Sequence, residues 1–163
     1  MKIPFNRALS LLLAGIAILL GAGNCKKSSN NGNAALSASV SGKDWTANYP
    51  VRGTYLGGQF EIGGLRVKGG DSTVLGLIFT APVVLNKPVS SDTSQIDVAS
   101  VDNETKTEYD GSTPGHSIIT IISYDSASRK IAGTFTGVLY NDTNGADSLI
   151  VTGGAFSASY TVQ

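Results

Sequence analysis

The feature that most constrains the fold is the alternation of apolar and polar residues in short runs along most of the chain. Near the start, Leu36, Ala38 and Val40 alternate with serines, and residues 156–162 repeat the same pattern at the C-terminus. A period of two places successive side chains on opposite faces of a β-strand. After Cys25 no stretch keeps an apolar period of about 3.6 residues, so we expect strands and no long helix.

Glycine-rich and polar segments separate these runs and predict the turns. We expect Gly63-Gly64 to form a hairpin turn or a bulge, and Gly153-Gly154 to form a tight turn. Both expectations depend on the ability of glycine to adopt backbone conformations that other residues avoid. Residues 54–62 are read as one continuous run before the first of these glycine pairs.

The strand pattern also predicts which strands lie at the centre of a sheet. Residues 74–79 are apolar on both faces and predict a central strand, whereas residues 96–100 alternate and predict an edge strand. About nine to ten short strands with frequent turns indicate an all-β fold, and we favour an antiparallel β-sandwich. The alternative is an up-and-down, lipocalin-like β-barrel, which periodicity alone does not distinguish from a sandwich.

The N-terminal segment predicts export from the cytoplasm. Lys2 and Arg7 precede an apolar run at residues 8–20, and small residues follow that run. This order of charged, apolar and small residues is typical of a secretory signal peptide. The apolar run is shorter than the roughly 20 residues that a spanning helix needs, so we expect residues 1–24 to be removed. The alternative is a membrane helix that is retained.

Cys25 is the only cysteine and follows the small residues directly. An exported chain with one cysteine forms no internal disulfide, so the thiol needs another explanation. The arrangement resembles a bacterial lipoprotein signal, with Ala22, Gly23 and Asn24 in the three places before the cysteine. The resemblance implies that the Cys25 sulfur carries diacylglycerol and that Cys25 becomes the new N-terminus. A soluble exported protein with a free thiol is the alternative.

The residues after the cysteine divide into a tether and a domain. Residues 26–33 are polar throughout, so residues 25–33 are expected to form the lipidated cysteine and a flexible tether. Residues 34–163 have the length of one domain, and we expect a single all-β domain there.

The charge balance argues against nucleic-acid binding. The full chain has 12 basic and 12 acidic residues, and removal of Lys2 and Arg7 leaves a small acidic excess. Proteins that bind nucleic acid neutralise phosphates with clustered Lys and Arg, and the sequence has no basic stripe.

Several stretches of the mature chain resemble the corresponding stretches in a known group of proteins. They are Cys25-Lys26-Lys27 and residues 39–47, 119–125, 130–135 and 151–156. In these stretches the chain resembles small lipoproteins of unknown function that are common in Bacteroidota. The resemblance implies an all-β, membrane-tethered domain, and it implies no catalytic residue and no cofactor.

His116 is the only histidine and raises the hypothesis of a hydrolase. A Ser–His–Asp site needs a base held by a carboxylate beside a nucleophile, and Ser112, Ser117 and Asp110 are near in sequence. Because the chain has no Gly-x-Ser-x-Gly motif, we expect His116 to be a solvated loop residue. One histidine and one cysteine also exclude the usual zinc sites.

Three other groups of residues could carry chemistry. Residues 142–147 place oxygen ligands around a glycine, as calcium loops do, although an Asn/Asp/Gly loop is the simpler interpretation. The acidic residues of segment 104–110 could form a glycosidase carboxylate pair, but a solvated polar surface is expected. Four aromatic residues could stack on sugars, although Trp45 falls on the apolar phase of its strand and is expected in the core. The carboxylates are Glu104, Glu108 and Asp110, and the aromatic residues are Trp45, Tyr49, Tyr55 and Tyr109.

Taken together, these patterns predict a lipoprotein anchored by lipid to the bacterial cell envelope, which serves there as a non-enzymatic structural or binding module of unknown ligand. We expect membrane lipid to be its partner through acylated Cys25, with the outer membrane as the expected location. We expect an envelope protein or glycan as a further partner, and no metal or cofactor. The alternative is a lipocalin-like carrier of a small apolar ligand, which needs an internal cavity lined by Phe60, Leu77, Ile121 and Phe135.

Overall fold

The computed structural model describes residues 34–90, 94–102, 105–111, 117–141, 143 and 145–163. Within these ranges the chain forms strands, turns and loops but no helix, so it contains no helical membrane span there. The all-β prediction is therefore confirmed. The described strands are β1 (Ala35–Val40), β2 (Lys43–Thr46), β3 (Arg52–Leu56), β4 (Gln59–Lys68), β5 (Asp71–Thr80), β6 (Pro88–Ser90), β7 (Ser94–Asp102), β8 (Thr105–Asp110), β9 (Ser117–Asp125), β10 (Lys130–Asn141) and β11 (Ser148–Val162).

All eleven strands belong to one hydrogen-bonded sheet, in the order β2-β1-β11-β3-β4-β5-β7-β8-β10-β9-β6. β11 also pairs with β10, so the strands from β11 through β3 and β8 to β10 form a ring. Every pairing is antiparallel except that of β11 with β3, which is parallel. The pairing is short at two places in this ring: β10 and β8 share only two residue pairs, and β11 and β3 share three.

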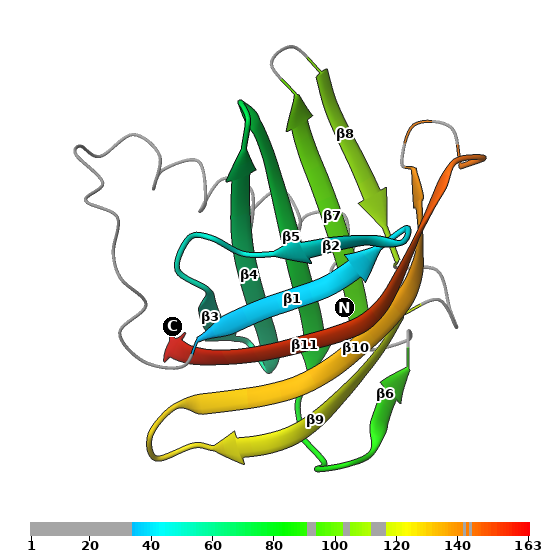
Figure 1. Cartoon of the computed structure of the whole chain (residues 1–163). Coiled ribbons are helices and arrows are strands. Elements are labelled where there is room, and N and C mark those ends of the chain that lie inside the picture. Colours follow the sequence, from blue (N-terminus) through cyan, green and yellow to red (C-terminus); the bar gives the residue numbers. More distant parts are fainter. Residues whose placement is uncertain (1–33, 91–93, 103–104, 112–116, 142, 144) are drawn as a thin grey trace.

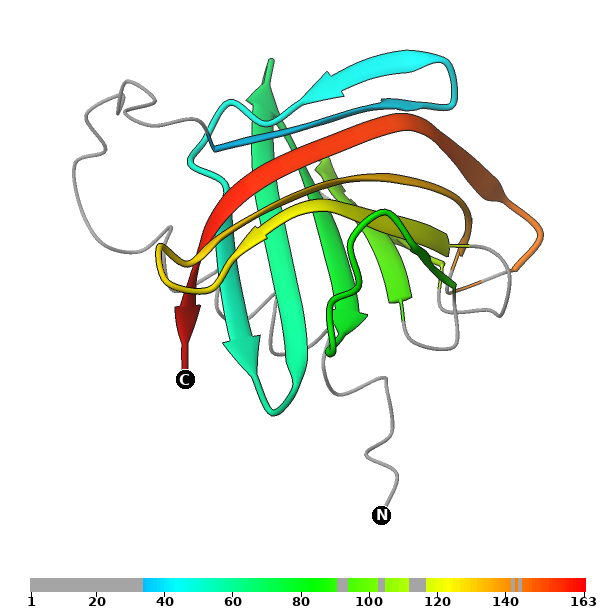
Figure 2. The same ribbon diagram turned by 90° about the horizontal axis from the view of Figure 1, so that it is seen from below.

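The sheet folds over so that two sets of strands face one another (Figure 1). β3, β4, β5, β7 and β8 form the first layer. β2, β1, β11, β10, β9 and β6 form the second layer. Figure 2 shows the strands of the second layer running across those of the first, with the core between them. The outer face of each layer is therefore the one turned away from this core.

The predicted turn or bulge at Gly63-Gly64 is wrong. β4 runs through both residues, and its register with β5 is continuous from Gln59 to Lys68. The hairpin turn lies earlier, at Gly57-Gly58, which divides residues 54–62 between β3 and β4. Gly64 is needed for close packing, because a Cβ there would lie 2.9 Å from Leu36 Cδ2 and 2.9 Å from Ala47 Cβ.

The predicted tight turn at Gly153-Gly154 is also wrong, because both residues lie inside the 15-residue strand β11. Gly153 has a φ of 59°, and the register of β11 shifts there against both neighbouring strands. This is a β-bulge. Glycine is favoured both in bulges and in turns, so the two have the same local sequence signal. The shift lies opposite Ser37–Ser39 on β1 and opposite Phe135–Gly137 on β10.

The two predictions of strand position had different outcomes. β5 lies between β4 and β7, so the predicted central strand at residues 74–79 is confirmed. The predicted edge strand at residues 96–100 is wrong, because β7 lies between β5 and β8. Its alternation arises because Gln95 and Asp97 point away from the core while Ile96 and Val98 point into it.

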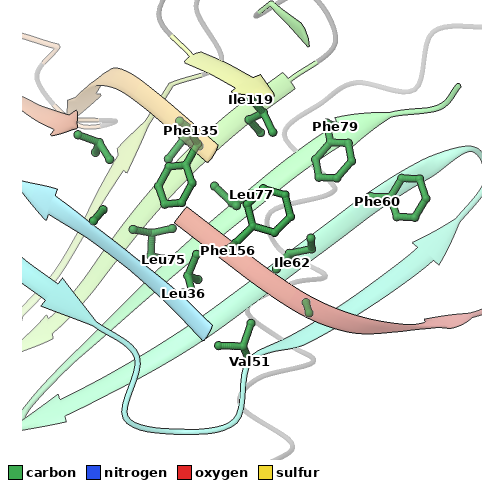
Figure 3. Packing of buried hydrophobic residues seen from close by; sticks show 14 of the residues in the cluster. Leu36, Val51, Phe60, Ile62, Leu75, Leu77, Phe79, Ile119, Phe135 and Phe156 are labelled. Atoms are coloured by element: carbon green, nitrogen blue, oxygen red, sulfur yellow. The ribbon is translucent and has the colours of Figure 1, made fainter. Parts of the chain in front are cut away.

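The core is built from apolar side chains of both layers, which point toward one another in Figure 3. A line of aromatic rings crosses it. Phe60 and Phe79 have ring centroids 5.2 Å apart, Phe79 and Phe156 are 6.3 Å apart, and Phe156 and Phe135 are 6.4 Å apart. Trp45 is only 2% exposed, which confirms its predicted place in the core.

Candidate functional site

The residues on which the lipoprotein prediction depends lie outside the described part of the chain. Cys25, the leader at residues 1–24 and the tether at residues 25–33 all precede Ala34, where the description begins. The anchor therefore remains a prediction from the sequence. His116 also lies outside the described residues, as does Ser112.

Ser117, the other serine of the hydrolase hypothesis, has a structural role at the start of β9. It is fully buried, and its hydroxyl donates to the carbonyl of Gly111 over 2.8 Å. The same oxygen accepts from the backbone N–H of Ile96 over 3.2 Å. These bonds join β9 to β7 and to the end of β8, so the hydroxyl is engaged in holding strands together.

The proposed calcium loop is only partly described, because Asp142 and Asn144 lie outside the described residues. Asp147 accepts a 2.6 Å hydrogen bond from the hydroxyl of Tyr109, and this bond raises the pKa of Tyr109 above its usual value. The Asn141 side chain accepts from the N–H of Thr143 over 2.8 Å, as in an Asx turn. In the described ranges, no group of three or more His, Cys, Asp or Glu residues is placed to hold a metal ion.

The four aromatic residues proposed as a sugar platform have different surroundings. Trp45 is buried, and the guanidinium carbon of Arg66 lies 6.0 Å from its ring centroid. Tyr55 is half-buried with its ring 4.6 Å from that of Phe60, and Tyr109 is bonded to Asp147. Tyr49 is 40% exposed.

The carboxylates of β8 lie on the outer face of the first layer, while Glu104 lies outside the described residues. Asp110 stands opposite Asp97 of β7, and Asp97 accepts a 2.7 Å hydrogen bond from the Gln95 amide. Glu61 of β4 lies on the same face, and burial raises the pKa of its carboxyl group. This outer face therefore gathers acidic side chains, and the sequence interpretation missed Asp97 and Glu61.

The second layer has a different outer surface, which contains a shallow groove of about 340 Å³ over β9, β10 and β11. The sequence interpretation did not find this groove. Its eight described lining residues have no ionisable side chain. They are Ile118, Thr120, Thr134, Phe135, Thr136, Gly153, Gly154 and Ala155.

The strand register explains how the groove forms. Thr134 of β10 stands between Thr120 of β9 and Ala155 of β11, so these three side chains share the outer face. The bulge at Gly153 lies two residues before Ala155 on β11. The hydroxyl of Thr136 donates to the carbonyl of Val151 over 2.9 Å beside this bulge. The result is a dent in the sheet with threonine side chains along one side of it.

The threonines continue a row of small uncharged side chains across the layer. From β2 to β9 the paired residues are Thr46, Ser37, Ala155, Thr134 and Thr120. Along this row the outward side chains are small or carry a hydroxyl group, which is the signal that could have marked it in the sequence, although Asp44 and the exposed Ile118 and Ile150 lie on the same face. The sequence does not show which strands are neighbours in the sheet, because β1 pairs with the last strand of the chain.

Comparison with known proteins gives no relative from which a function could be transferred. No protein-family model matches the chain, and neither the curated proteins nor the solved structures gave a match.

Proposed function

We propose that the protein is a non-enzymatic binding module of the bacterial cell envelope, held to a membrane through acylated Cys25. The observation that carries the binding role is the uncharged groove on the outer face of β9, β10 and β11. Threonine hydroxyls, exposed glycine backbone and one isoleucine can bind a partner, but they supply no acid, base or strong nucleophile. The expected location is the outer membrane, and the expected partner is an envelope protein or glycan.

The anchor is supported by the sequence at the N-terminus. Lys2, Arg7 and the apolar run place Cys25 where a bacterial lipoprotein carries its lipid. Two or more acyl chains attach a protein far more firmly than one, because each buried CH₂ contributes about 0.8 kcal/mol. The polar residues 26–33 can extend by at most about 3.5 Å each, which keeps the domain close to the bilayer. The resemblance to Bacteroidota lipoproteins agrees with this arrangement and stays a prediction.

The packing of the core supports a binding surface over an internal carrier site. The carrier hypothesis needs a cavity among Phe60, Leu77, Ile121 and Phe135, and all four side chains are buried in one apolar cluster. Rings at stacking distance occupy the space between the layers, with Phe60 also 5.2 Å from the ring of Tyr160. A ligand of the lipocalin type would have to displace these rings.

We also classify the fold as a β-sandwich, closed at two short junctions, and not as an up-and-down barrel. Four strands, β1, β2, β6 and β9, lie outside the ring of paired strands. The first strand pairs with the last, and the junction of β11 with β3 is parallel. An up-and-down barrel joins each strand to the next with antiparallel pairing throughout.

Metabolic labelling tests the anchor. The full-length chain is expressed in a bacterial host that processes lipoproteins and is supplied with clickable palmitate. We expect label on the wild-type protein in the membrane fraction and no label on Cys25→Ser. Equal labelling of the two chains, or no labelling of the wild type, would contradict the anchor.

A further inference from the structure

The hydroxyl groups in the groove are available to a ligand. Thr136 is engaged with the carbonyl of Val151, but the hydroxyls of Thr120 and Thr134 make no hydrogen bond within the described part of the chain. Thr134 is exposed, Thr120 is half-buried, and the two stand directly opposite one another on β10 and β9. Both groups can donate and accept hydrogen bonds.

These hydroxyls form part of a regular grid. Adjacent strands are about 4.7–4.9 Å apart, and residues two apart on one strand are separated by roughly twice 3.3 Å. Thr120 and Thr134 follow the first direction, and Thr134 and Thr136 follow the second. The hydroxyl groups of a sugar can both donate to and accept from such threonine hydroxyls. Each threonine also presents a methyl group, and Ile118 is 40% exposed, so the groove can contact the C–H faces of sugars as well.

The charge distribution selects an uncharged ligand. The lining residues of the groove and the row from Thr46 to Thr120 carry no ionisable group. A charged ligand would lose hydration there without gaining a partner. Charged side chains lie elsewhere on the surface, at Asp44 on β2 of the same layer and at Glu61 and Asp110 on the other layer, so the neutrality belongs to the groove itself.

The position of the groove argues against a peptide strand or a second copy of the chain. A peptide that extends a sheet needs a free strand edge, but β10 is paired with β9 on one side and β11 on the other across the groove. A stable dimer buries about 800 Å² on each partner with closely matching shapes. The eight described residues that line the groove are far fewer than the roughly 20–30 that each partner contributes to such an interface.

We propose that this groove binds an uncharged glycan chain. The inference rests on the proposed binding function and names the class of ligand for that site. Thr120 and Thr134 supply side-chain hydrogen bonds, and Ile118 and the threonine methyl groups contact the sugar rings. The bulge at Gly153 leaves backbone groups outside the regular ladder, where they can meet sugar hydroxyls.

Affinity electrophoresis of the full-length, detergent-extracted protein tests the proposal. The gels contain dextran, xylan, soluble starch or hydroxyethyl cellulose, and a fifth gel contains anionic polygalacturonate. We expect at least one neutral polysaccharide to retard the protein and polygalacturonate to leave its mobility unchanged. The double variant Thr120→Val, Thr134→Val should bind about tenfold more weakly or worse, because two hydrogen bonds are lost.

The matched control is Thr161→Val, which removes an exposed hydroxyl from the same layer at the end of β11, away from the groove. It should bind like the wild type. The proposal is overturned if no neutral polysaccharide retards the protein, if only polygalacturonate does, or if the double variant binds equally well. Self-association that the double variant abolishes would also overturn it in favour of a second copy.

The Cys25→Ser chain separates this proposal from the anchor. It should lose its palmitate label and keep its retardation by the neutral polysaccharide. Retention of binding without any label on the wild type would contradict the anchor alone. Labelling of the wild type without any retardation would contradict the glycan site alone.

Discussion

The ring of Phe135 lies directly against the backbone of Gly154, its partner across β10 and β11. A Cβ on Gly154 would be 2.5 Å from Phe135 Cδ2 and 2.5 Å from the Phe135 carbonyl oxygen. The absence of a side chain at Gly154 therefore allows a core ring to lie beneath the bulge, and it links the packed interior to the groove on the outer face.

Gly154→Ala should destabilise the protein by about 1–3 kcal/mol, because one of the two clashing atoms belongs to the backbone and cannot rotate away. The measurement is the free energy of unfolding in urea. Ala155→Ser, at the exposed next position, is the control and should change stability by no more than about 0.5 kcal/mol. Equal stability of Gly154→Ala and wild type would mean that the ring does not occupy this place.

Gly64→Ala tests the contact between the layers at the other end of the core. The new methyl group would lie 2.9 Å from both Leu36 Cδ2 and Ala47 Cβ, so we expect a loss of about 1–3 kcal/mol. Leu36→Val shortens one of the two neighbours and should restore part of the loss. The double variant should therefore lose less unfolding free energy than the sum of the losses in the two single variants, as a double-mutant cycle measures. Additive effects would contradict a direct contact.

Both glycines belong to pairs that look alike in the sequence but have different roles. Gly57-Gly58 forms a hairpin turn, Gly64 lies in a regular strand, and Gly153 forms a bulge. The local sequence reports only that a side chain is missing. Whether the backbone turns there, or another element packs closely against it, depends on residues far away in the chain, such as Leu36 for Gly64.

The strands themselves were easier to predict than their neighbours. Alternation located Leu36 and Trp45 in the core, and a continuous apolar run located the central strand β5. Pairing of β1 with β11 joins the two ends of the domain, and no local pattern encodes it. The groove depends on this order, since Thr120, Thr134 and Ala155 come from three strands and were individually unremarkable hydroxyl or small residues.

The Asn48 side chain should protect the edge of β4 at Val67, beyond Leu65, whose carbonyl accepts from the backbone N–H groups of Asn48 and Tyr49. β3 pairs only with the first half of β4, and the Asn48 side chain bonds to both backbone groups of Val67, at 2.8 and 2.9 Å. Asn48→Ala should cost about 0.5–1.5 kcal/mol for each lost bond and should speed amide exchange at Val67. Asn48→Asp keeps the acceptor and should preserve the protection of the Val67 amide. Unchanged exchange in Asn48→Ala would contradict this role.

The stacked pair Tyr124 and Tyr160 predicts a loss of stability at high pH. Burial and the 3.4 Å contact with the Tyr124 hydroxyl raise the pKa of Tyr160 from 10.0 to about 12. Between these two values the unfolded chain releases the proton while the folded chain keeps it. The unfolded state then binds fewer protons, so the free energy of unfolding falls as the pH rises through this window.

Thermal melts between neutral pH and pH 12 measure this fall, with phenolate absorbance as a second readout. Tyr160→Phe removes the titrating group and should flatten the decline in melting temperature above pH 10. Tyr49→Phe, at a 40% exposed position, is the control and should keep the decline of the wild type. If Tyr160→Phe and wild type decline in parallel, the Tyr160 hydroxyl is not shielded by the core as its contacts with Phe60 and Tyr124 require.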